Sequence, residues 1–175
     1  KSSTDPLAKQ IAVRCTNRRK PSASHIDPNE LNAIIQVVEP IHGCAAYAVH
    51  GVEAMERAAN LVGSAERIRL LNPIGHREFF GTELRWSAEE AERSRDGLDI
   101  RTMELKHSER AALEVSSDKS AVGLLRAWGN GKGFEKLTGD AIRLSGAVVL
   151  IASEGHDALH ILRAGRAAQR IWLKA

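Results

Sequence analysis

The stretch AYAVHGVEAMERAANLVG (46–63) decides the fold that the sequence predicts, because its pattern returns 66 positions later. The counterpart is ALEVSSDKSAVGLLRAWG (112–129). Each stretch opens with a short β-prone run, breaks at a small polar pair and continues as an apolar helix. A glycine, Gly63 or Gly129, then closes each helix. This shared order of elements indicates an internal duplication.

The first predicted repeat covers residues 43–108 and has the order β-α-β-β-α-β. We expect its strands at 44–50, 67–73, 77–86 and 98–106, and its helices at 51–63 and 87–97. Ser87 followed by Glu90 is typical of a capped helix start.

The second predicted repeat covers residues 109–175 and follows the same order. We expect its strands at 110–116, within 133–144, at 146–153 and at 170–174, and its helices at 118–128 and 154–165. An N-terminal extension, residues 1–42, precedes both repeats. It is predicted to hold a strand at 9–15 and a helix at 25–40, with Asp27 as cap, Pro28 in the first turn and Glu30 completing a capping box.

The predicted fold is therefore α+β, a tandem duplication of a ferredoxin-like β-α-β-β-α-β domain with an N-terminal strand-helix extension. Two unrelated split β-α-β units are the alternative, since that arrangement is common in small domains. Six short elements bury little apolar area alone, so we expect the halves to pack against each other or against neighbouring chains.

Composition fits a packed domain: the 175 residues are 43% hydrophobic and 27% charged, with a net charge of +3. No apolar run approaches the roughly 20 residues of a membrane span, and the first residues lack the apolar core of a signal peptide. The basic cluster 18–20 has no interleaved aromatic residues, so a solvated turn is favoured over a nucleic-acid patch. Cys15 and Cys44 form no disulfide framework, and we expect a reducing cytoplasm.

Several small residues of the first repeat resemble the bacterial microcompartment shell domain. That family has a strand, a glycine and a helix of the kind G-x-x-A-x-x-x-A-A-[DN]. The matching residues are Gly51, Ala54, Ala58, Ala59, Asn60, the pair Ser64-Ala65 and the turn Ile74-Gly75. In the second repeat, LSGAVVLIASEG (144–155) and HDALHILRAG (156–165) resemble the turn, strand and alanine-rich helix of the same domain.

The resemblance implies a structural protein without catalytic activity or cofactor, located in a cytoplasmic microcompartment shell. Such tandem-domain proteins form homotrimers that imitate a hexagon and tile with neighbouring shell proteins, with a pore for small metabolites. The turn that lines the pore corresponds to Ile74, Gly75 and His76 in one repeat and to Leu144, Ser145 and Gly146 in the other. Gly63 and Gly129 replace the lysine that the family uses at the tile edge, where Arg67, Arg126 or Lys132 are the nearest substitutes.

Two other classes of function stay open at this stage. Tandem domains of the ACT kind share this element order and bind small metabolites, and the cluster 18–20 leaves a basic nucleic-acid-binding protein as a further alternative.

Three local patterns are candidate chemical sites. His156 and His160 with Glu154 and Asp157 have a spacing compatible with a metal, but a capped polar helix is favoured and we predict no metal site. The loop 129–133, GNGKG, follows a helix and therefore differs from a phosphate-binding P-loop. Asp99, Glu104 and Lys106 are spaced more tightly than a metal-dependent nuclease core.

Overall fold

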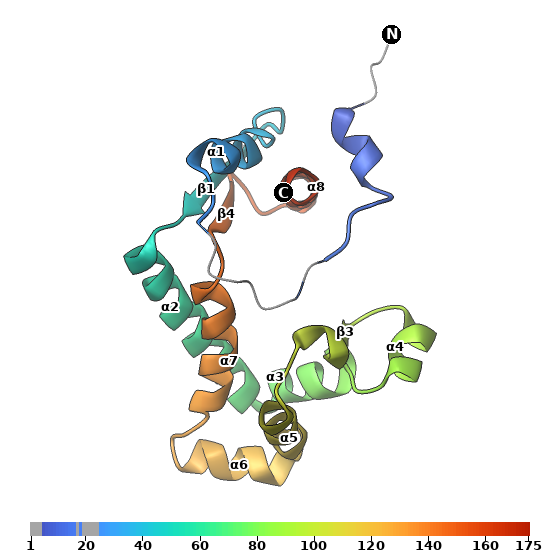
Figure 1. Cartoon of the computed structure of the whole chain (residues 1–175), viewed down its shortest axis with the longest axis vertical. Coiled ribbons are helices and arrows are strands. Elements are labelled where there is room, and N and C mark those ends of the chain that lie inside the picture. The colour runs from blue at the N-terminus through green and yellow to red at the C-terminus, as the bar shows by residue number, and fades with distance from the viewer. Residues whose placement is uncertain (1–4, 17, 19–24) are drawn as a thin grey trace. The chain divides into compact units, whose positions relative to one another are not determined.

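The computed structural model describes residues 5–16, 18 and 25–175, and the chain forms two compact units (Figure 1). Of the described residues, unit 1 contains 5–16, 25–55 and 145–175, and unit 2 contains 18 and 56–144. Unit 1 thus contains the first and the last described segments of the chain.

Unit 1 contains one strand pair and the helices packed on it. Its elements are η1 (Pro6–Gln10), α1 (Pro28–Gln36), β1 (Cys44–Val49), β4 (Val148–Ser153) and α8 (Ala158–Lys174).

Unit 2 is mostly helical. Its elements are the greater part of α2 (Val52–Leu71), then α3 (Pro73–Glu78), η2 (Phe79–Glu83), β2 (Leu84–Arg85), α4 (Ala88–Ser94), β3 (Leu98–Asp99), η3 (Ile100–Met103), α5 (His107–Ser116), α6 (Lys119–Ala127) and α7 (Lys132–Arg143).

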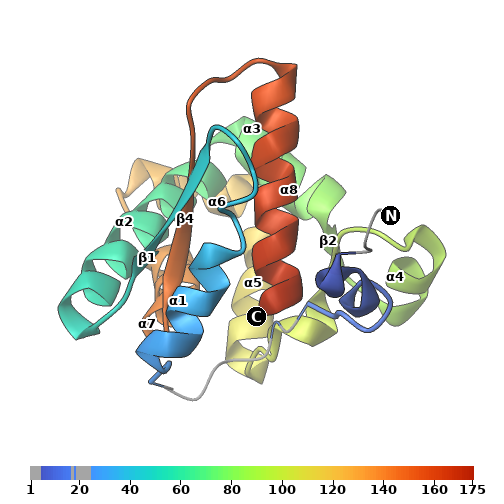
Figure 2. The ribbon, with the colours of Figure 1, turned by 90° about the horizontal axis from the view of Figure 1, so that it is seen from above.

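The strands β1 and β4 of unit 1 pair antiparallel, with Cys44 opposite Ser153 and Val49 opposite Val148. Helix α1 packs on β1 and α8 packs on β4 (Figure 2). The side chain of Asp27 accepts a hydrogen bond from the backbone N–H of Asn29 at 2.7 Å, which starts α1 as the sequence predicts. The buried apolar residues of this unit are Leu31, Val38, Ile41, Met55 and Ala167.

Unit 2 is built around a closed apolar core. The core residues are Leu70, Phe79, Phe80, Leu84, Ile100, Leu113, Val122 and Phe134. The rings of Phe79 and Phe80 meet edge to face with centroids 5.0 Å apart, an arrangement that aromatic pairs favour.

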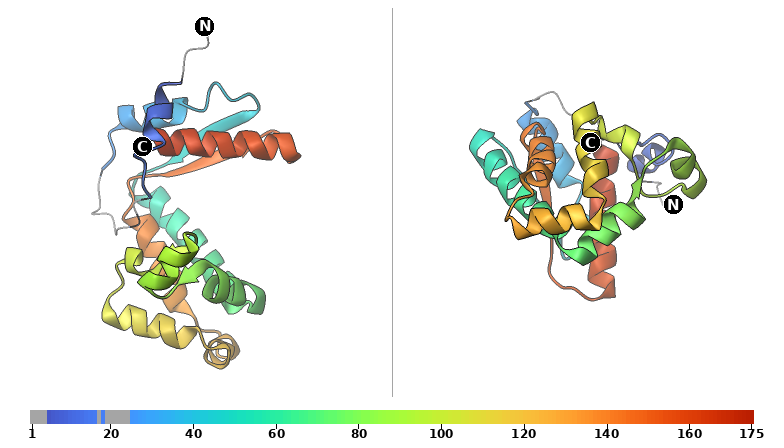
Figure 3. Two further views of the ribbon diagram at one scale, coloured as in Figure 1. Left: turned by 90° about the vertical axis from the view of Figure 1, so that its right-hand side faces the viewer. Right: turned by 90° about the horizontal axis from the view of Figure 1, so that it is seen from below.

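Helices α2 and α7 lie side by side in unit 2 (Figure 3). The Arg143 guanidinium joins them, since it donates to the Glu56 carboxylate and to the Asn60 side chain, each at 2.8 Å. Gly63 faces α7 so closely that a Cβ there would lie 2.6 Å from the Glu135 carbonyl oxygen. The glycine thus permits close helix contact and does not end the helix.

The predicted tandem duplication is wrong. The described residues contain four short strands in two separate two-stranded sheets, and most of the chain is helical. Four segments predicted as strands are largely or wholly helical, namely 67–73, 110–116, 133–144 and 170–174. Two further predicted strands, 77–86 and 98–106, keep only the two-residue strands β2 and β3. The predicted strand at 9–15 holds the end of η1 and a turn.

These errors share one physical cause. Short runs such as RIRLL (67–71) and RIWLK (170–174) satisfy the periodicity of a strand and of a helix equally well. Packing settles the choice: Leu70 is 3% exposed because the continued helix carries it into the core of unit 2. The helices at α1, α4 and α6 and the strands β1 and β4 are confirmed.

The units also follow a different division from the predicted segments 1–42, 43–108 and 109–175. The cause is the long-range pairing of β1 with β4, which no local pattern specifies.

Candidate interaction surface

One side of the β1–β4 pair is apolar, with three of its six residues exposed and the other three partly buried. Directly opposed residues of an antiparallel pair point to the same side, so three such pairs share one face. They are Ala45 with Ala152, Tyr47 with Leu150, and Val49 with Val148. Tyr47 is 59% exposed and Leu150 is 53% exposed. We call these six residues the open sheet face.

The opposite side of the same strands faces the helices of unit 1. Val149 lines a cavity together with Ile34 of α1 and Ile171 of α8. An antiparallel sheet in water normally alternates apolar residues inside with polar residues outside. The β1–β4 pair is apolar on both sides, which indicates that its open side is built to be covered.

Helix α8 also has two apolar sides. Its inner side places Ala164, Ala167 and Ile171 toward the unit, and Ala167 is completely buried. Its outer side carries Ile161, Gly165, Ala168 and Trp172, all exposed, at the helical spacing i, i+4, i+7, i+11. We call these four residues the outer stripe of α8. Leu162 lies beside it and is 61% exposed.

Residues near the start of the chain, together with the end of α1, hold the C-terminal half of α8 in place. Arg170 donates a hydrogen bond to the Val37 carbonyl at 2.6 Å and forms an ion pair with Asp5. The backbone N–H of Leu7 and then the Arg170 side chain lower the pKa of the Asp5 carboxyl. The Arg14 guanidinium lies 3.9 Å from the centre of the Trp172 ring. These contacts fix the orientation in which α8 presents its outer stripe.

A cavity of about 480 Å³ lies in unit 1 between α1, the start of β4 and the end of α8. Its walls are mostly apolar, and the polar side chains among its lining residues are His25 and Glu30. The volume is within the range of small-molecule sites.

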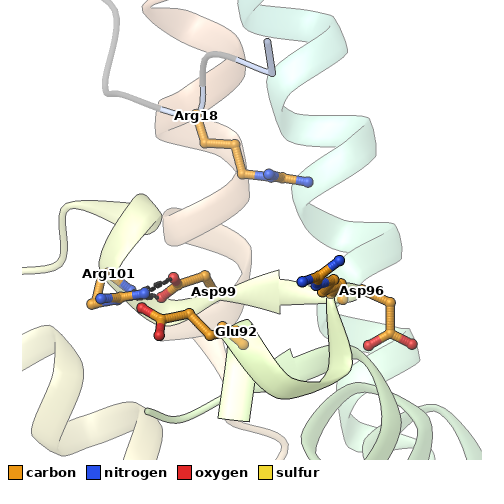
Figure 4. A pocket seen from close by; sticks show the side chains of 8 residues that line it. Arg18, Glu92, Asp96, Asp99 and Arg101 are labelled. Atoms are coloured by element: carbon orange, nitrogen blue, oxygen red, sulfur yellow. Dashed lines mark hydrogen bonds and ion pairs between the residues drawn. The ribbon is translucent and has the colours of Figure 1, made fainter. Parts of the chain in front are cut away.

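Unit 2 carries a smaller charged hollow of about 260 Å³ (Figure 4). Its lining includes three arginines and three carboxylates: Arg18, Arg95, Arg101, Glu92, Asp96 and Asp99. Arg101 binds Asp99 through two of its nitrogens, and Arg85 binds Asp96 at 2.6 Å. These arginine hydrogen bonds are the main cause of the lowered pKa of each of the two aspartates. Because the lining has as many positive as negative side chains, the hollow has no charge preference for an anion or a cation.

The six predicted pore residues lie in two different environments. Asn72 caps α3, so Ile74, Gly75 and His76 form a helix and the predicted turn is wrong. His76 is 4% exposed, and its Nε2 lies 2.9 Å from the Ser116 carbonyl oxygen.

Leu144, Ser145 and Gly146 do lie in a loop, the one that connects α7 to β4. The pore stays a prediction, and residues 74–76 do not form the turn that was expected to line it.

The other candidate chemical sites of the sequence have structural roles. Asp157 caps α8, and its carboxylate oxygen lies 2.8 Å from Nδ1 of His160. In the segment 129–133, Lys132 and Gly133 already belong to α7, and the carbonyls of Gly129 and Asn130 accept hydrogen bonds from Arg67, one of the predicted substitutes for the tile-edge lysine. Asp99 is paired with Arg101, and Arg19 and Lys20 of the basic cluster lie outside the described residues.

Within the ranges that the structure describes, no three His, Cys, Asp or Glu side chains are placed to hold a metal ion. No helix in those ranges has the length and apolar character to cross a membrane.

The open sheet face and the outer stripe of α8 were missed by sequence reasoning. A signal was present, because 44–49 and 148–152 are apolar at every position and 158–172 carries more apolar residues than one helix face needs. The sequence predicts a buried strand at 146–153, and it divides 154–174 into a helix at 154–165 and a strand at 170–174, so a continuous apolar stripe along one helix is not expected.

The chain is similar to an uncharacterized protein of Mycobacterium tuberculosis (strain CDC 1551 / Oshkosh), designated MT1398. The two are 27% identical over 169 residues, which cover 97% of this chain and 23% of that protein. The chain therefore spans less than a quarter of that relative's length. No protein family matches the chain, and no solved structure does.

Proposed function

We propose that this chain is a structural assembly module that joins copies of its own chain through the apolar surfaces of unit 1. The open sheet face is the observation that carries the proposal. Packing against α1 and α8 supports one side of this two-stranded sheet, and the apolar residues on its other side are left without a helix over them. Tyr47 and Leu150 supply a large apolar contact with limited side-chain entropy to lose.

The burial of these side chains gives an estimate of the driving force. Covering an aromatic or leucine side chain contributes about 1.5–3 kcal/mol for full burial, at about 25 cal/mol per Å² of apolar surface. Tyr47 and Leu150 expose more than half of their surface, so each keeps a large part of that free energy for association. Exposed apolar patches of this kind mark interaction sites in soluble proteins.

The proposal keeps the coarse part of the role that the sequence suggested, namely assembly of many chains. The shell tile, its homotrimer and its neighbouring shell proteins stay predictions, and the duplicated domain on which they were based is absent from the fold. The location in a microcompartment likewise stays a prediction.

The test is the molar mass in solution, measured by light scattering behind a sizing column over a range of concentrations. We expect the wild-type chain to form oligomers. The double variant Tyr47→Lys/Leu150→Glu should weaken them, because it places charges on the open sheet face. These residues are directly opposed, so the new charges attract each other across the strands and preserve the pairing.

Val115→Lys is the matched control, since Val115 is 65% exposed and belongs to unit 2. It should leave the molar mass unchanged. A wild-type chain that stays monomeric at every concentration, or a control that dissociates the oligomer equally, would contradict the proposal.

A second candidate function is the binding of a small apolar ligand, in line with the regulatory alternative from the sequence. The cavity of about 480 Å³ in unit 1 favours it, with Glu30 placed to meet a basic group of the ligand. The fluorescent dye 1-anilinonaphthalene-8-sulfonate is a suitable apolar probe. Its binding should fall when Ala147→Phe fills the cavity, and unchanged binding would rule this candidate out.

A further inference from the structure

The outer stripe of α8 has a symmetry that identifies its partner. The pair Ile161 and Trp172 is centred between residues 166 and 167 of the helix. The pair Gly165 and Ala168 is centred at the same point. The two large side chains are therefore at equal distances from the centre, and the two small residues lie between them. The whole stripe is about 16 Å long, at about 1.5 Å per residue.

We propose that two copies of α8 pack antiparallel through their outer stripes, about a twofold axis between residues 166 and 167. Each Ile161 then meets Trp172 of the second copy, and each Gly165 meets Ala168 of the second copy. This inference rests on the proposed self-association and specifies which surface makes the symmetric contact. An isologous contact needs a surface that is complementary to itself, and the outer stripe has that property.

The small residues permit the close approach that this packing needs. A Cβ built on Gly165 would meet no atom within 4 Å, so the space above the helix is open. Ile161 is 64% exposed, and Trp172 is 44% exposed with the Arg14 guanidinium over one part of its ring, so both side chains keep surface for a partner. Helices that pack through small residues approach to about 8 Å, near the lower end of the usual range.

The charges at the ends of α8 favour the antiparallel direction. Asp157 lies at the N-terminus of the helix and Lys174 in its last turn. Antiparallel packing brings the Asp157 end of one copy to the Lys174 end of the other, and it also opposes the two helix dipoles. Parallel packing would align like charges and like dipole ends.

The expected affinity follows from the size of the contact. One pair of helices buries less than the roughly 800 Å² per partner of a standard interface, so we expect dissociation constants of about 1–100 µM. The open sheet face is a separate surface and remains available for further contacts.

The first experiment compares Gly165→Arg with Gly123→Arg in sedimentation equilibrium of the full chain. Both glycines lie inside helices and have open space around them, so both variants should fold. We expect Gly165→Arg to raise the dissociation constant at least about tenfold, which corresponds to about 1.4 kcal/mol. Gly123→Arg should leave it unchanged.

The second experiment determines the direction of packing by disulfide trapping. Chains with Gly165→Cys and chains with Ala168→Cys, both in a Cys15→Ser/Cys44→Ser background, are mixed and oxidised with copper phenanthroline. Antiparallel packing about this axis predicts that the mixed 165–168 disulfide exceeds both homodimeric disulfides. An excess of 165–165 and 168–168 disulfides would overturn the proposed geometry.

The outcomes also separate this inference from the proposed function. Oligomers that persist in Gly165→Arg but dissociate in Tyr47→Lys/Leu150→Glu overturn the α8 contact and leave the assembly role standing. A monomeric wild-type chain overturns both.

Discussion

The two units of this chain differ in how completely they bury their apolar residues. Unit 2 surrounds eight apolar side chains with short helices, and Leu84 at its centre is 1% exposed. Unit 1 rests two strands on two helices and leaves Tyr47 and Leu150 more than half exposed. The comparison shows that apolar content alone does not distinguish a core from a contact surface, because the topology decides which side is covered.

The largest effect should come from shortening the same residue type in each unit. Leu84→Ala removes a buried side chain and should lower the free energy of unfolding by about 2–5 kcal/mol. Leu150→Ala, at a 53% exposed position, should change it by less than about 0.5 kcal/mol. Urea unfolding in dilute solution, below the concentration of self-association, measures both. Equal losses would mean that the open sheet face is covered within the monomer.

A smaller effect should come from adding a methyl group at two helical glycines of unit 2. Gly63→Ala forces a Cβ against the Glu135 carbonyl and should destabilise the packing of α2 on α7 by about 1–3 kcal/mol. Gly123→Ala meets open space in α6 and should stabilise the protein by about 0.5–1 kcal/mol. Thermal unfolding followed by circular dichroism compares the two. A neutral Gly63→Ala would show that α2 and α7 are loosely packed.

The smallest effect concerns acid, because each unit has a helix capped by an aspartate. The backbone N–H of Ala121 is the main cause of the lowered pKa of Asp118, which caps α6. The backbone N–H of His160 is the main cause of the lowered pKa of Asp157, which caps α8. A carboxyl whose pKa is lower in the folded state contributes stability above its unfolded pKa of about 3.9, and this stability is lost as the pH falls through the folded pKa.

Asparagine keeps the cap without the charge, so Asp118→Asn and Asp157→Asn should each reduce the loss of stability between about pH 5 and pH 2.5. Urea midpoints across that interval provide the measurement. An acid dependence that both variants leave intact would show that the caps are not its source.

Local signals in the sequence determined the helix starts and the two longer strands. Asp27 and Ser87 each accept a hydrogen bond from a backbone N–H in the first turn of the helix they were expected to cap, and β1 and β4 form at the runs expected for them. These features depend on residues that are neighbours in the chain, so the sequence specifies them directly.

Only the tertiary structure decided where α2 and α8 end and which strands pair. Gly63 has the signal of a helix end, yet α2 continues to Leu71 because the missing side chain lets α7 approach. The segment 170–174 continues α8 because Arg170 binds the Val37 carbonyl, a contact across 133 positions. Intrinsic preferences differ by only about 1 kcal/mol per residue, so contacts between distant segments override them. The candidate interaction surface has the same origin: the sequence supplied the apolar residues, and the pairing of β1 with β4 determined which of them remain exposed.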